Sequence, residues 1–479
     1  MRAGNTIIKV TGVLMKRLHS VAVSAVIILL FAVSPQAEEK PEAVLDSIEV
    51  LALQTAQSLA LAANPDLRAA QARVEQARAR VSQAVAAWWP TLDATGFAQH
   101  QRLAGITYES MELMASLAGG TADKDKEVFG AGLQATWILF DGFYRKFNKQ
   151  MAEYGEKSAQ AAWVNSQRLL VTSVAEAFYN AQLSQTNVDI AQADEAFYLR
   201  QLEDAQNRYD VGAGPWGDVL NIKVQLNSAR TSLMRSRREH EAASYGLAAL
   251  MGLPDALLPA HIRLASLEKD CTLEESVADV DGLIRDALAR RSDVRQLEQL
   301  VQQAEAGAGM AKAPLYPTVV LAGSVSGDRT EDVGFTDDDF GSSIALKLQW
   351  NLFAGGADKA RLLEARQAQR EAEYTLAHVR TLVASEVRQN IALLEAAKEQ
   401  VRLQRESVKL VEENRDLAKN EYEAGETSLV RLNEAQRDLT ATYGRLAQSV
   451  ASYHLARQRL QAATGHNLDS MTTRAWLPE

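Results

Sequence analysis

Histidine, cysteine and clustered aspartate are the residues of this sequence whose chemistry suits metal binding or catalysis, and their spacing favours neither. The seven histidines are scattered and form no HExxH pair or other ligand cluster. The single cysteine, Cys271, excludes an intrachain disulfide and a cysteine-rich metal site. The sequence has no phosphate-binding loop, nucleophile elbow or dinucleotide fingerprint. We therefore expect no catalytic residues, no metal site and no cofactor.

The acidic run Asp337-Asp338-Asp339 carries the oxygen ligands that divalent cations prefer. It falls in a polar segment, where charged side chains are ordinarily solvated. We favour a solvated loop over a cation site.

The composition indicates long helices and excludes nucleic acid as a partner. Glycine (27) and proline (10) are few for 479 residues, of which 47% are hydrophobic. Such a mixture favours long helices over loop-rich domains. The formal net charge of −10 gives no basic face that would neutralise phosphates.

The N-terminal residues 1–37 are predicted to be a secretory signal peptide. Lys16 and Arg17 precede an apolar stretch over 21–33, and Ala37 offers a small residue for cleavage. Met15 is a second candidate start. Because no other stretch of 18 apolar residues follows, we expect export without an inner-membrane helix.

The chain repeats itself. Asn64-Pro65-Asp66-Leu67 corresponds to Arg291-Ser292-Asp293-Val294, and Trp89-Pro90-Thr91 to Tyr316-Pro317-Thr318, at an offset of 227 residues. Trp137-Ile138-Leu139-Phe140-Asp141-Gly142 then matches Trp350-Asn351-Leu352-Phe353-Ala354-Gly355 at an offset of 213. That second offset persists through the pairs Tyr209 with Tyr422, Gly212 with Gly425, and Gly252 with Gly465. Such an ordered series of matches indicates an internal duplication.

Five segments follow from this duplication. We predict the signal peptide, a first structural repeat over 38–252, a linker over 253–280, a second repeat over 281–465 and a C-terminal tail over 466–479.

Each repeat is predicted to contain a helix, two strands, a very long helix and a returning helix. Asp46 to Ala87 has helical composition with a step at Asn64-Pro65, and residues 91–101 suit a strand. Residues 143–210 and 357–423 lack proline, and helices of this length extend about 100 Å. The returning helices have heptad spacing at the following positions: Val219, Ile222, Leu226, Ala229 and Leu233, then Leu432, Ala435, Leu439, Tyr443, Leu446, Val450 and Tyr453.

Two further segments alternate clearly between one apolar and one mainly polar set of residues. Within 129–140 the apolar set is every second residue: Phe129, Ala131, Leu133, Ala135, Trp137 and Leu139. In the second repeat it is Ile344, Leu346, Leu348, Trp350 and Leu352. A period of two with one apolar and one polar face indicates a sheet between two different media.

Three features favour a membrane barrel over a soluble sandwich. The strands have about the ten residues that a tilted membrane strand needs. The intervening segments 102–128 and 328–340 are polar, as loops are. Aromatic residues lie at the strand ends, as in an interfacial belt: Trp88, Trp89, Trp137, Phe140, Tyr316, Trp350 and Phe353.

Four strands cannot close a barrel, and an open edge in lipid leaves backbone groups unpaired. Two chains would give eight strands with a filled interior, whereas three would give twelve strands and a lumen. The sheet therefore requires an oligomer.

The paired Asn-Pro-Asp-Leu and Trp-Pro segments, the Trp-x-Leu-Phe-x-Gly strand ends and the Tyr-x-x-Gly turns resemble the TolC-type outer-membrane efflux channels. The resemblance covers nearly the whole mature chain. It implies a mainly α fold with a membrane β region: internally duplicated helical hairpins form a periplasmic α-barrel, and four strands per chain contribute to a trimeric 12-stranded outer-membrane β-barrel. It also implies an equatorial region formed by the linker and the C-terminus.

The resemblance further implies how such a protein works. A homotrimer in outer-membrane lipid docks onto a periplasmic adaptor protein and an inner-membrane transporter, in a tripartite efflux or type I secretion system. The transporter supplies the energy and largely determines the substrate, and the channel catalyses nothing.

The hairpin turns at Gly212 and Gly425 would then form the periplasmic tip that closes the pore. Asp218 matches the family's acidic position, whereas Arg431 stands where relatives carry an aspartate, and Glu434 matches a second acidic position. Arg431 argues against a purely acidic ring of side chains at the pore entrance. An Asp218–Arg431 ion pair could hold the tip shut, although solvated charges explain both residues equally well. Tyr209 and Tyr422 would pack at the hairpin ends.

Two alternatives remain from the sequence. A periplasmic coiled-coil adaptor would be soluble and would carry a lipoyl-like β-domain between its hairpin arms. A structural envelope scaffold would have no pore, so it would conduct no ions.

Overall fold

The computed structural model describes residues 45, 48–267, 272–273, 279–330 and 333–472. The predicted signal peptide 1–37, Cys271 and parts of the predicted linker and tail lie outside these ranges. The chain divides into the units Met1–Ile48 and Glu49–Glu479, and the second unit holds all the elements described below.

The step predicted at Asn64-Pro65 separates two helices, α3 (Leu53–Ala63) and α4 (Pro65–Ala86). The Asn64 side chain accepts hydrogen bonds from the backbone N–H groups of Asp66 and Leu67, at 2.9 and 3.3 Å, and so caps α4. Pro65 occupies the first helical position, where its missing N–H costs nothing.

The helix predicted from Asp46 was wrong near its start. Val50–Leu51 forms strand β1, parallel to β4 (Arg263–Leu264) of the predicted linker. The amide of Arg263 donates to Glu49 O, and the amide of Ala265 donates to Leu51 O. A backbone partner more than 200 residues away therefore overrides local helix propensity.

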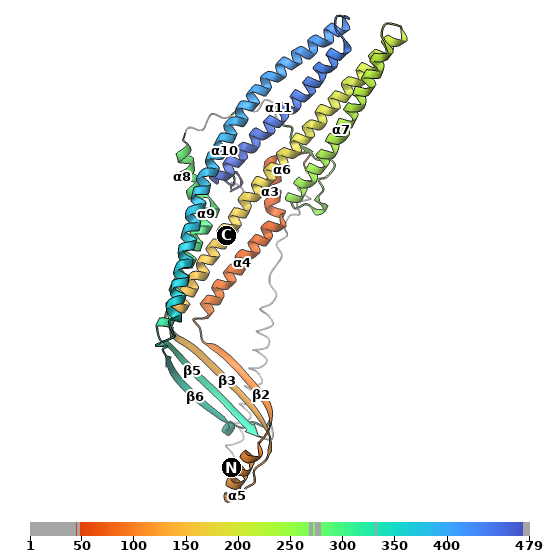
Figure 1. The fold of residues 1–479 in the computed structure, drawn as a ribbon. Coiled ribbons are helices and arrows are strands. Elements are labelled where there is room, and N and C mark those ends of the chain that lie inside the picture. Colours follow the sequence, from red (N-terminus) through yellow and green to blue (C-terminus); the bar gives the residue numbers. More distant parts are fainter. Residues whose placement is uncertain (1–44, 46–47, 268–271, 274–278, 331–332, 473–479) are drawn as a thin grey trace, which may run out of the picture. The chain divides into compact units, whose positions relative to one another are not determined.

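The long helices are as predicted. α6 (Tyr144–Asp210) and α10 (Ala357–Glu423) have 67 residues each, and each returns through a shorter helix, α7 (Trp216–Leu250) or α11 (Leu429–Thr464) (Figure 1). The second repeat begins with α8 (Val280–Arg290) and α9 (Ser292–Met310), and α12 (Asp469–Thr472) follows α11. Short 3-10 turns occur at Pro254–Ala256 (η1), Ala313–Leu315 (η2) and Asp337–Asp339 (η3).

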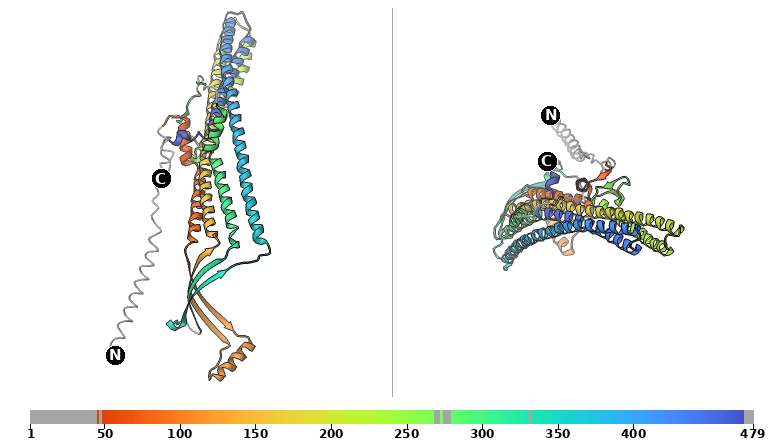
Figure 2. Two further views of the ribbon diagram at one scale, coloured as in Figure 1. Left: turned by 90° about the vertical axis from the view of Figure 1, so that its left-hand side faces the viewer. Right: turned by 90° about the horizontal axis from the view of Figure 1, so that it is seen from above.

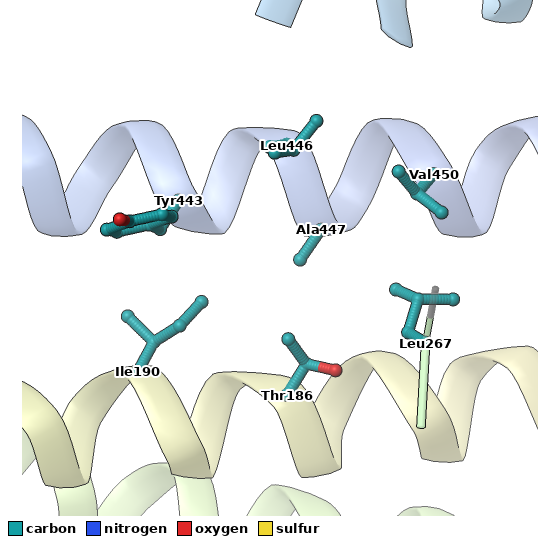
Figure 3. A pocket seen from close by; sticks show the side chains of 7 residues that line it. All are labelled: Thr186, Ile190, Leu267, Tyr443, Leu446, Ala447 and Val450. Atoms are coloured by element: carbon teal, nitrogen blue, oxygen red, sulfur yellow. The ribbon is translucent and has the colours of Figure 1, made fainter. Parts of the chain in front are cut away.

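The predicted heptad residues of α7 and α11 form the helical core. They are buried except Tyr443, which is partly exposed. α6 also packs against α11, which joins the two hairpins of one chain. Thr186 and Ile190 of α6 face Tyr443, Leu446 and neighbouring residues of α11 around a pocket of 20 Å³, about the room of one water (Figure 3). The two hairpins are therefore closely packed here.

A charged network around two buried arginines, Arg291 and Arg168, fixes the start of α9. The Arg291 guanidinium donates to Asp293 at 2.6 and 3.0 Å, to Glu386 of α10 at 2.6 Å and to the carbonyl of Ala463 at 3.1 Å. Arg168 of α6 lies 3.6 Å from the same Asp293 carboxylate. Arg291 thus joins the start of α9 to α10 and α11, and Asp293 joins it to α6.

The four long strands form one antiparallel sheet in the order β2–β3–β5–β6. They are β2 (Thr91–Arg102), β3 (Asp125–Asp141), β5 (Thr318–Thr330) and β6 (Phe340–Gln349). All four leave the same end of the helices, as Figures 1 and 2 show. The central pair, β3 with β5, joins the two repeats.

Two strand predictions need correction. A bulge between Ile138 and Phe140 makes Leu139 an extra residue, so Phe140 takes the position opposite Val319 that alternation assigned to Leu139. β6 ends at Gln349, which leaves Trp350 and Phe353 outside it. Pairing with β5 stops there because β5 begins at Thr318, after Pro317, which has no N–H to donate.

The segment 102–128, predicted as a loop, contains helix α5 (Gly105–Leu117), and β3 begins at Asp125. The shorter segment between β5 and β6 contains only the turn η3 within its described residues. The different lengths of these two segments account for the change of offset between the repeats.

Candidate functional site at the sheet and the helical hairpin tips

The strand registers assemble two continuous and chemically different faces. Cross-strand partners place these residues on an apolar face: Leu92, Ala94, Leu133, Ala135, Trp137, Phe140, Val319, Leu321, Val325, Ile344, Leu346 and Leu348. The opposite face carries these polar residues: Asp93, Thr95, Gln99, Gln134, Thr136, Ser324, Ser326, Ser343, Lys347 and Gln349. The predicted alternation thus extends across all four strands.

No element of the described chain covers either face. Every residue of β2 and β6 is exposed, including Leu92 at 74% and Ile344 at 79%. Transfer of an apolar side chain of this size from water into an apolar medium is favourable by about 1.5–3 kcal/mol. An uncovered apolar face of this extent therefore requires an apolar neighbour.

One aromatic residue lies on the polar face. Phe97 of β2 pairs with Gly130 of β3, and its ring occupies the space that a side chain at position 130 would fill. An aromatic ring over a strand glycine restores the packing that glycine lacks. Phe97 therefore fixes the β2–β3 register on the polar side.

The tryptophans at the strand ends make the same hydrogen bond in both repeats. The Trp137 indole donates to Trp88 O at 3.0 Å, and the Trp350 indole donates to Leu315 O at 3.2 Å. Trp88 and Leu315 are equivalent at the 227 offset, as Trp137 and Trp350 are at the 213 offset. Each indole therefore ties the end of one strand to the residues that precede its neighbour.

The remaining predicted belt residues gather at the same junctions. Phe143, at φ 70°, contacts the rings of Phe140 and Tyr316 edge-on, at 5.3 and 5.9 Å between centroids. The Trp88 ring lies 4.8 Å from the Arg145 guanidinium, and Arg145 bonds Asp141 at 2.7 Å. Trp89 and Phe353 are 73% and 85% exposed.

Replacing Trp137 or Trp350 with phenylalanine should lower the free energy of unfolding by about 0.5–1.5 kcal/mol each, the net value of a hydrogen bond. Urea unfolding of the detergent-purified protein, followed by circular dichroism, measures the change. Trp216→Phe is the control, since its indole has no acceptor among the described residues. An equal loss of stability in the control would show that the smaller ring, and not the lost hydrogen bond, causes the change.

The hairpin turns close identically. Gly212 and Gly425 have φ of 75° and 78°, and each follows a long helix. The amides of Gly212 and Ala213 donate to Tyr209 O and Arg208 O, and those of Gly425 and Glu426 donate to Tyr422 O and Glu421 O. This is the Schellman motif, which needs glycine because other residues are strained at positive φ.

The two predicted tyrosines pack differently. The Tyr209 ring lies 5.0 Å from the Trp216 ring of the same hairpin. Tyr422 of the second hairpin lies 5.2 Å from the Arg208 guanidinium of the first. Burial raises the pKa of the Tyr422 hydroxyl, and the Asp218 carboxylate raises it further. Tyr422 therefore lies where the two hairpins meet.

The three predicted charges lie near the tips, but the structure does not form the Asp218–Arg431 ion pair. Arg431 donates instead to Asn414 Oδ1 of its own hairpin at 2.9 Å. Asp218 is partly exposed in the first turn of α7, and Arg431 and Glu434 are exposed on α11. Arg431 therefore finds its partner across the antiparallel α10–α11 pair of its own hairpin.

Sequence reasoning missed the contacts that join the hairpins. Leu432 and Leu429 of α11 are buried in one cluster with Val219 and Ile222 of α7. Farther along α11, Gln436 and Thr440 donate to Asp194 of α6 at 3.0 and 2.9 Å.

Asn433 adds a third link, since its side-chain amide donates to Asn221 Oδ1 of α7 at 3.4 Å. The signal for these polar links was available, because Asn433 and Gln436 directly follow the heptad residues Leu432 and Ala435 and so flank the apolar seam.

The acidic run at Asp337–Asp339 does not form a cation site in the described structure. The Asp339 carboxylate accepts hydrogen bonds from the Thr336 amide and hydroxyl, and Arg329 lies 3.2 Å away. Those bonds to Thr336, and then Arg329, hold the pKa of Asp339 below its usual range. Among the described residues, no group of three or more His, Cys, Asp or Glu side chains is arranged to hold a metal ion.

None of the helices in the described ranges combines the length and apolar character needed to cross a membrane.

Comparisons with known proteins agree with this architecture. The chain is 26% identical to the cation efflux system protein CusC of Escherichia coli K12 over 408 residues, 84% of this chain and 82% of CusC. It is 23% identical to nodulation protein T of Rhizobium leguminosarum bv. trifolii, over 84% of this chain and 83% of that protein. The open state of the MtrE outer membrane channel of Neisseria gonorrhoeae has the same fold, with a TM-score of 0.71 and 22% identity over 87% of this chain and 89% of MtrE.

The sequence profile of the family described as outer membrane efflux protein matches residues 56–253 and 283–466. These two segments contain the long helical hairpins and the four strands of the sheet. The chain therefore belongs to the outer membrane efflux protein family and acts as an outer-membrane efflux channel.

Proposed function

We propose that three copies of this chain form one continuous duct, with a 12-stranded barrel in the outer membrane and a barrel of long helices in the periplasm. The observation that carries the proposal is the sheet, which has one apolar and one polar face. Among the described residues, no element covers either face, and β2 and β6 are its edge strands. Closure removes both edges and assigns the apolar face to lipid and the polar face to a lumen.

The number of copies follows from the size of the sheet. Each chain supplies four long strands. Eight strands from two copies would leave an interior filled by side chains, whereas twelve from three would leave a lumen. A closed cyclic trimer uses the same pair of edges at every subunit boundary.

The duct is proposed to be passive and to catalyse no reaction. Its polar face supplies amides, hydroxyls and isolated charges, which hydrate a lumen without binding one substrate tightly. The helical tips would dock onto a periplasmic adaptor protein, and an inner-membrane transporter would supply the energy. Membership of the outer membrane efflux protein family supports this part of the proposal.

The tips are proposed to be the gate. Asp218, Arg431 and Glu434 are partly or fully exposed there, where they would face the entrance or a partner. The buried cluster of Leu432 with Val219 and Ile222 would hold the two hairpins of each chain together. In this arrangement apolar packing, rather than an Asp218–Arg431 pair, keeps the entrance narrow.

The oligomeric mass tests the assembly. The protein should be recovered from outer-membrane fractions as a heat-modifiable species with the mass of three mature chains, measured in detergent by light scattering. A soluble monomer would contradict the proposal and leave the coiled-coil adaptor as the better interpretation.

A further inference from the structure

The internal duplication extends to the register of the strands. Thr91 of β2 pairs with Thr136 of β3, and their equivalents, Thr318 of β5 and Gln349 of β6, pair with each other. Under the two offsets, the β2–β3 and β5–β6 hairpins therefore have one register. β2 and β5 also share Gly96 with Gly323 and Arg102 with Arg329.

Within the four-stranded sheet of the described chain, β3–β5 is then the strand pair that joins the two repeats. It pairs Leu133 with Val325 and Trp137 with Leu321. β6 is the equivalent of β3, and β2 is the equivalent of β5. β6 and β2 are the edge strands of the sheet, and each has unpaired backbone groups in a single chain.

We infer that β6 pairs with β2 of a neighbouring copy in the register of the β3–β5 joint, which places Leu346 opposite Ala98 of that copy. This inference rests on the proposed trimer and adds the residues of its subunit boundary. The same mapping puts Leu348 opposite Gly96 and Trp350 opposite Ala94. β6 would then continue past Gln349 to Trp350, which has no cross-strand partner within the described chain.

The two faces of the sheet agree with this register. Leu346 and Leu348 lie on the apolar face, and so do Gly96 and Ala98. A slip by one residue would place the apolar residues of β6 beside the polar face of β2. Only slips by an even number of residues keep the faces continuous.

The junction between strands and helices gives a second, independent observation. Inside the chain, Gly142 closely approaches the carbonyl of Ala313, and Phe143 contacts Tyr316. The equivalent Gly355 has φ of 64°, and no atom of the described chain beyond its own neighbours lies within 4 Å of the position that a Cβ would occupy there.

The equivalent of Tyr316 is Trp89, and that of Phe140 is Phe353. Trp89 is 73% exposed and Phe353 is 85% exposed, whereas Tyr316 is 46% exposed. The turn at Gly355 therefore lacks the cover that its counterpart has. Phe353 also lacks the ring that Phe143 places against Phe140, because the equivalent of Phe143 is Gly356. In the inferred contact, Trp89 of the neighbouring copy packs over this turn and against Phe353.

Disulfide trapping distinguishes the registers. Directly opposed residues of antiparallel strands have Cα atoms about 4.5–5.5 Å apart, within the reach of a disulfide. Diagonal neighbours two residues away are about 7–8 Å apart, beyond that reach. In a Cys271→Ser background, Ala98→Cys is combined in turn with Ile344→Cys, Leu346→Cys or Leu348→Cys, three exposed positions on one face of β6.

After oxidation, the Ala98→Cys/Leu346→Cys protein should run as covalent dimers and trimers on non-reducing denaturing gels, while the other two pairs stay mostly monomeric. Leu133→Cys/Val325→Cys is the positive control, because it should lose its free thiols and keep the monomer mass. Native trimers under reducing conditions establish that each variant folds.

Preferential cross-linking of the 344 or 348 pair would overturn the register. No cross-linking of any pair within intact trimers would overturn the pairing of β6 with β2. A monomeric mass in detergent would overturn the proposed function as well, so the two failures are distinguishable.

Discussion

Replacing Arg291 with alanine should lower the free energy of unfolding by about 3 kcal/mol, near the lower end for breaking a buried ion pair. Arg291 is buried and joins Asp293, Glu386 and the carbonyl of Ala463, so its loss removes bonds to three segments at once. Arg168 still neutralises part of the Asp293 charge at 3.6 Å, which keeps the loss from being larger. Urea unfolding followed by circular dichroism at pH 7 gives the difference.

Arg290 supplies a matched control. It is half-exposed and bonds Asp286 and Asp469, so Arg290→Ala should cost no more than about 1 kcal/mol. Similar losses in the two variants would show that the network around Arg291 does not fix the start of α9.

The effect of Arg291 should also depend on pH. Burial alone would raise the pKa of Asp293, but the hydrogen bonds and charge of Arg291, with the charge of Arg168, outweigh it and hold the pKa below its usual range. A depressed carboxylate pKa contributes stability above the unfolded value, and that stability is lost as the pH falls through the folded value. The difference between wild type and Arg291→Ala should therefore shrink below about pH 4.

Replacing Leu432 with alanine should raise the single-channel conductance of the protein. Leu432 is fully buried among Val219 and Ile222 of the other hairpin. Truncating a buried leucine costs about 2–5 kcal/mol. Because this cluster joins the hairpins at their tips, its loss should let them separate while the distant sheet stays closed.

Val430→Ala is the control, since Val430 lies on the same helix two residues away and is exposed. It should leave the conductance unchanged. If Leu432→Ala folds as a trimer and conducts like the wild type, the apolar cluster does not hold the tip.

The long helices could be predicted from the sequence because their limits are set by local signals. Proline is absent over the whole of α6 and α10, and Gly212 and Gly425 stand where each helix must end. The two faces of the sheet were predictable for a similar reason, since alternation with a period of two indicates a strand with an apolar and a polar face.

The features that were missed depend on partners distant in sequence. The bulge at Leu139 arises where β3 meets β5, some 180 residues later. Strand β1 exists only because Arg263–Leu264 lies beside it. The partners of Arg291 in α10 and α11 are 95 and 172 residues away, and nothing local to Arg291 indicates them.

Helix α5 is a different case. Its residues include the helix formers Met, Glu, Leu and Ala, but all its side chains are partly or fully exposed, so no periodicity marked it within a segment interpreted as a loop. The hypothesised Asp218–Arg431 pair is not formed within the described chain, because the sequence places two charges near one tip without fixing which neighbour each one meets.

The most direct test of the duct is the single-channel conductance of the detergent-purified protein in a planar bilayer, with its mass determined on the same sample. The proposed trimer predicts discrete, uniform conductance steps from a species of three chains. A pure trimer that inserts into the bilayer and passes no current would contradict a continuous lumen.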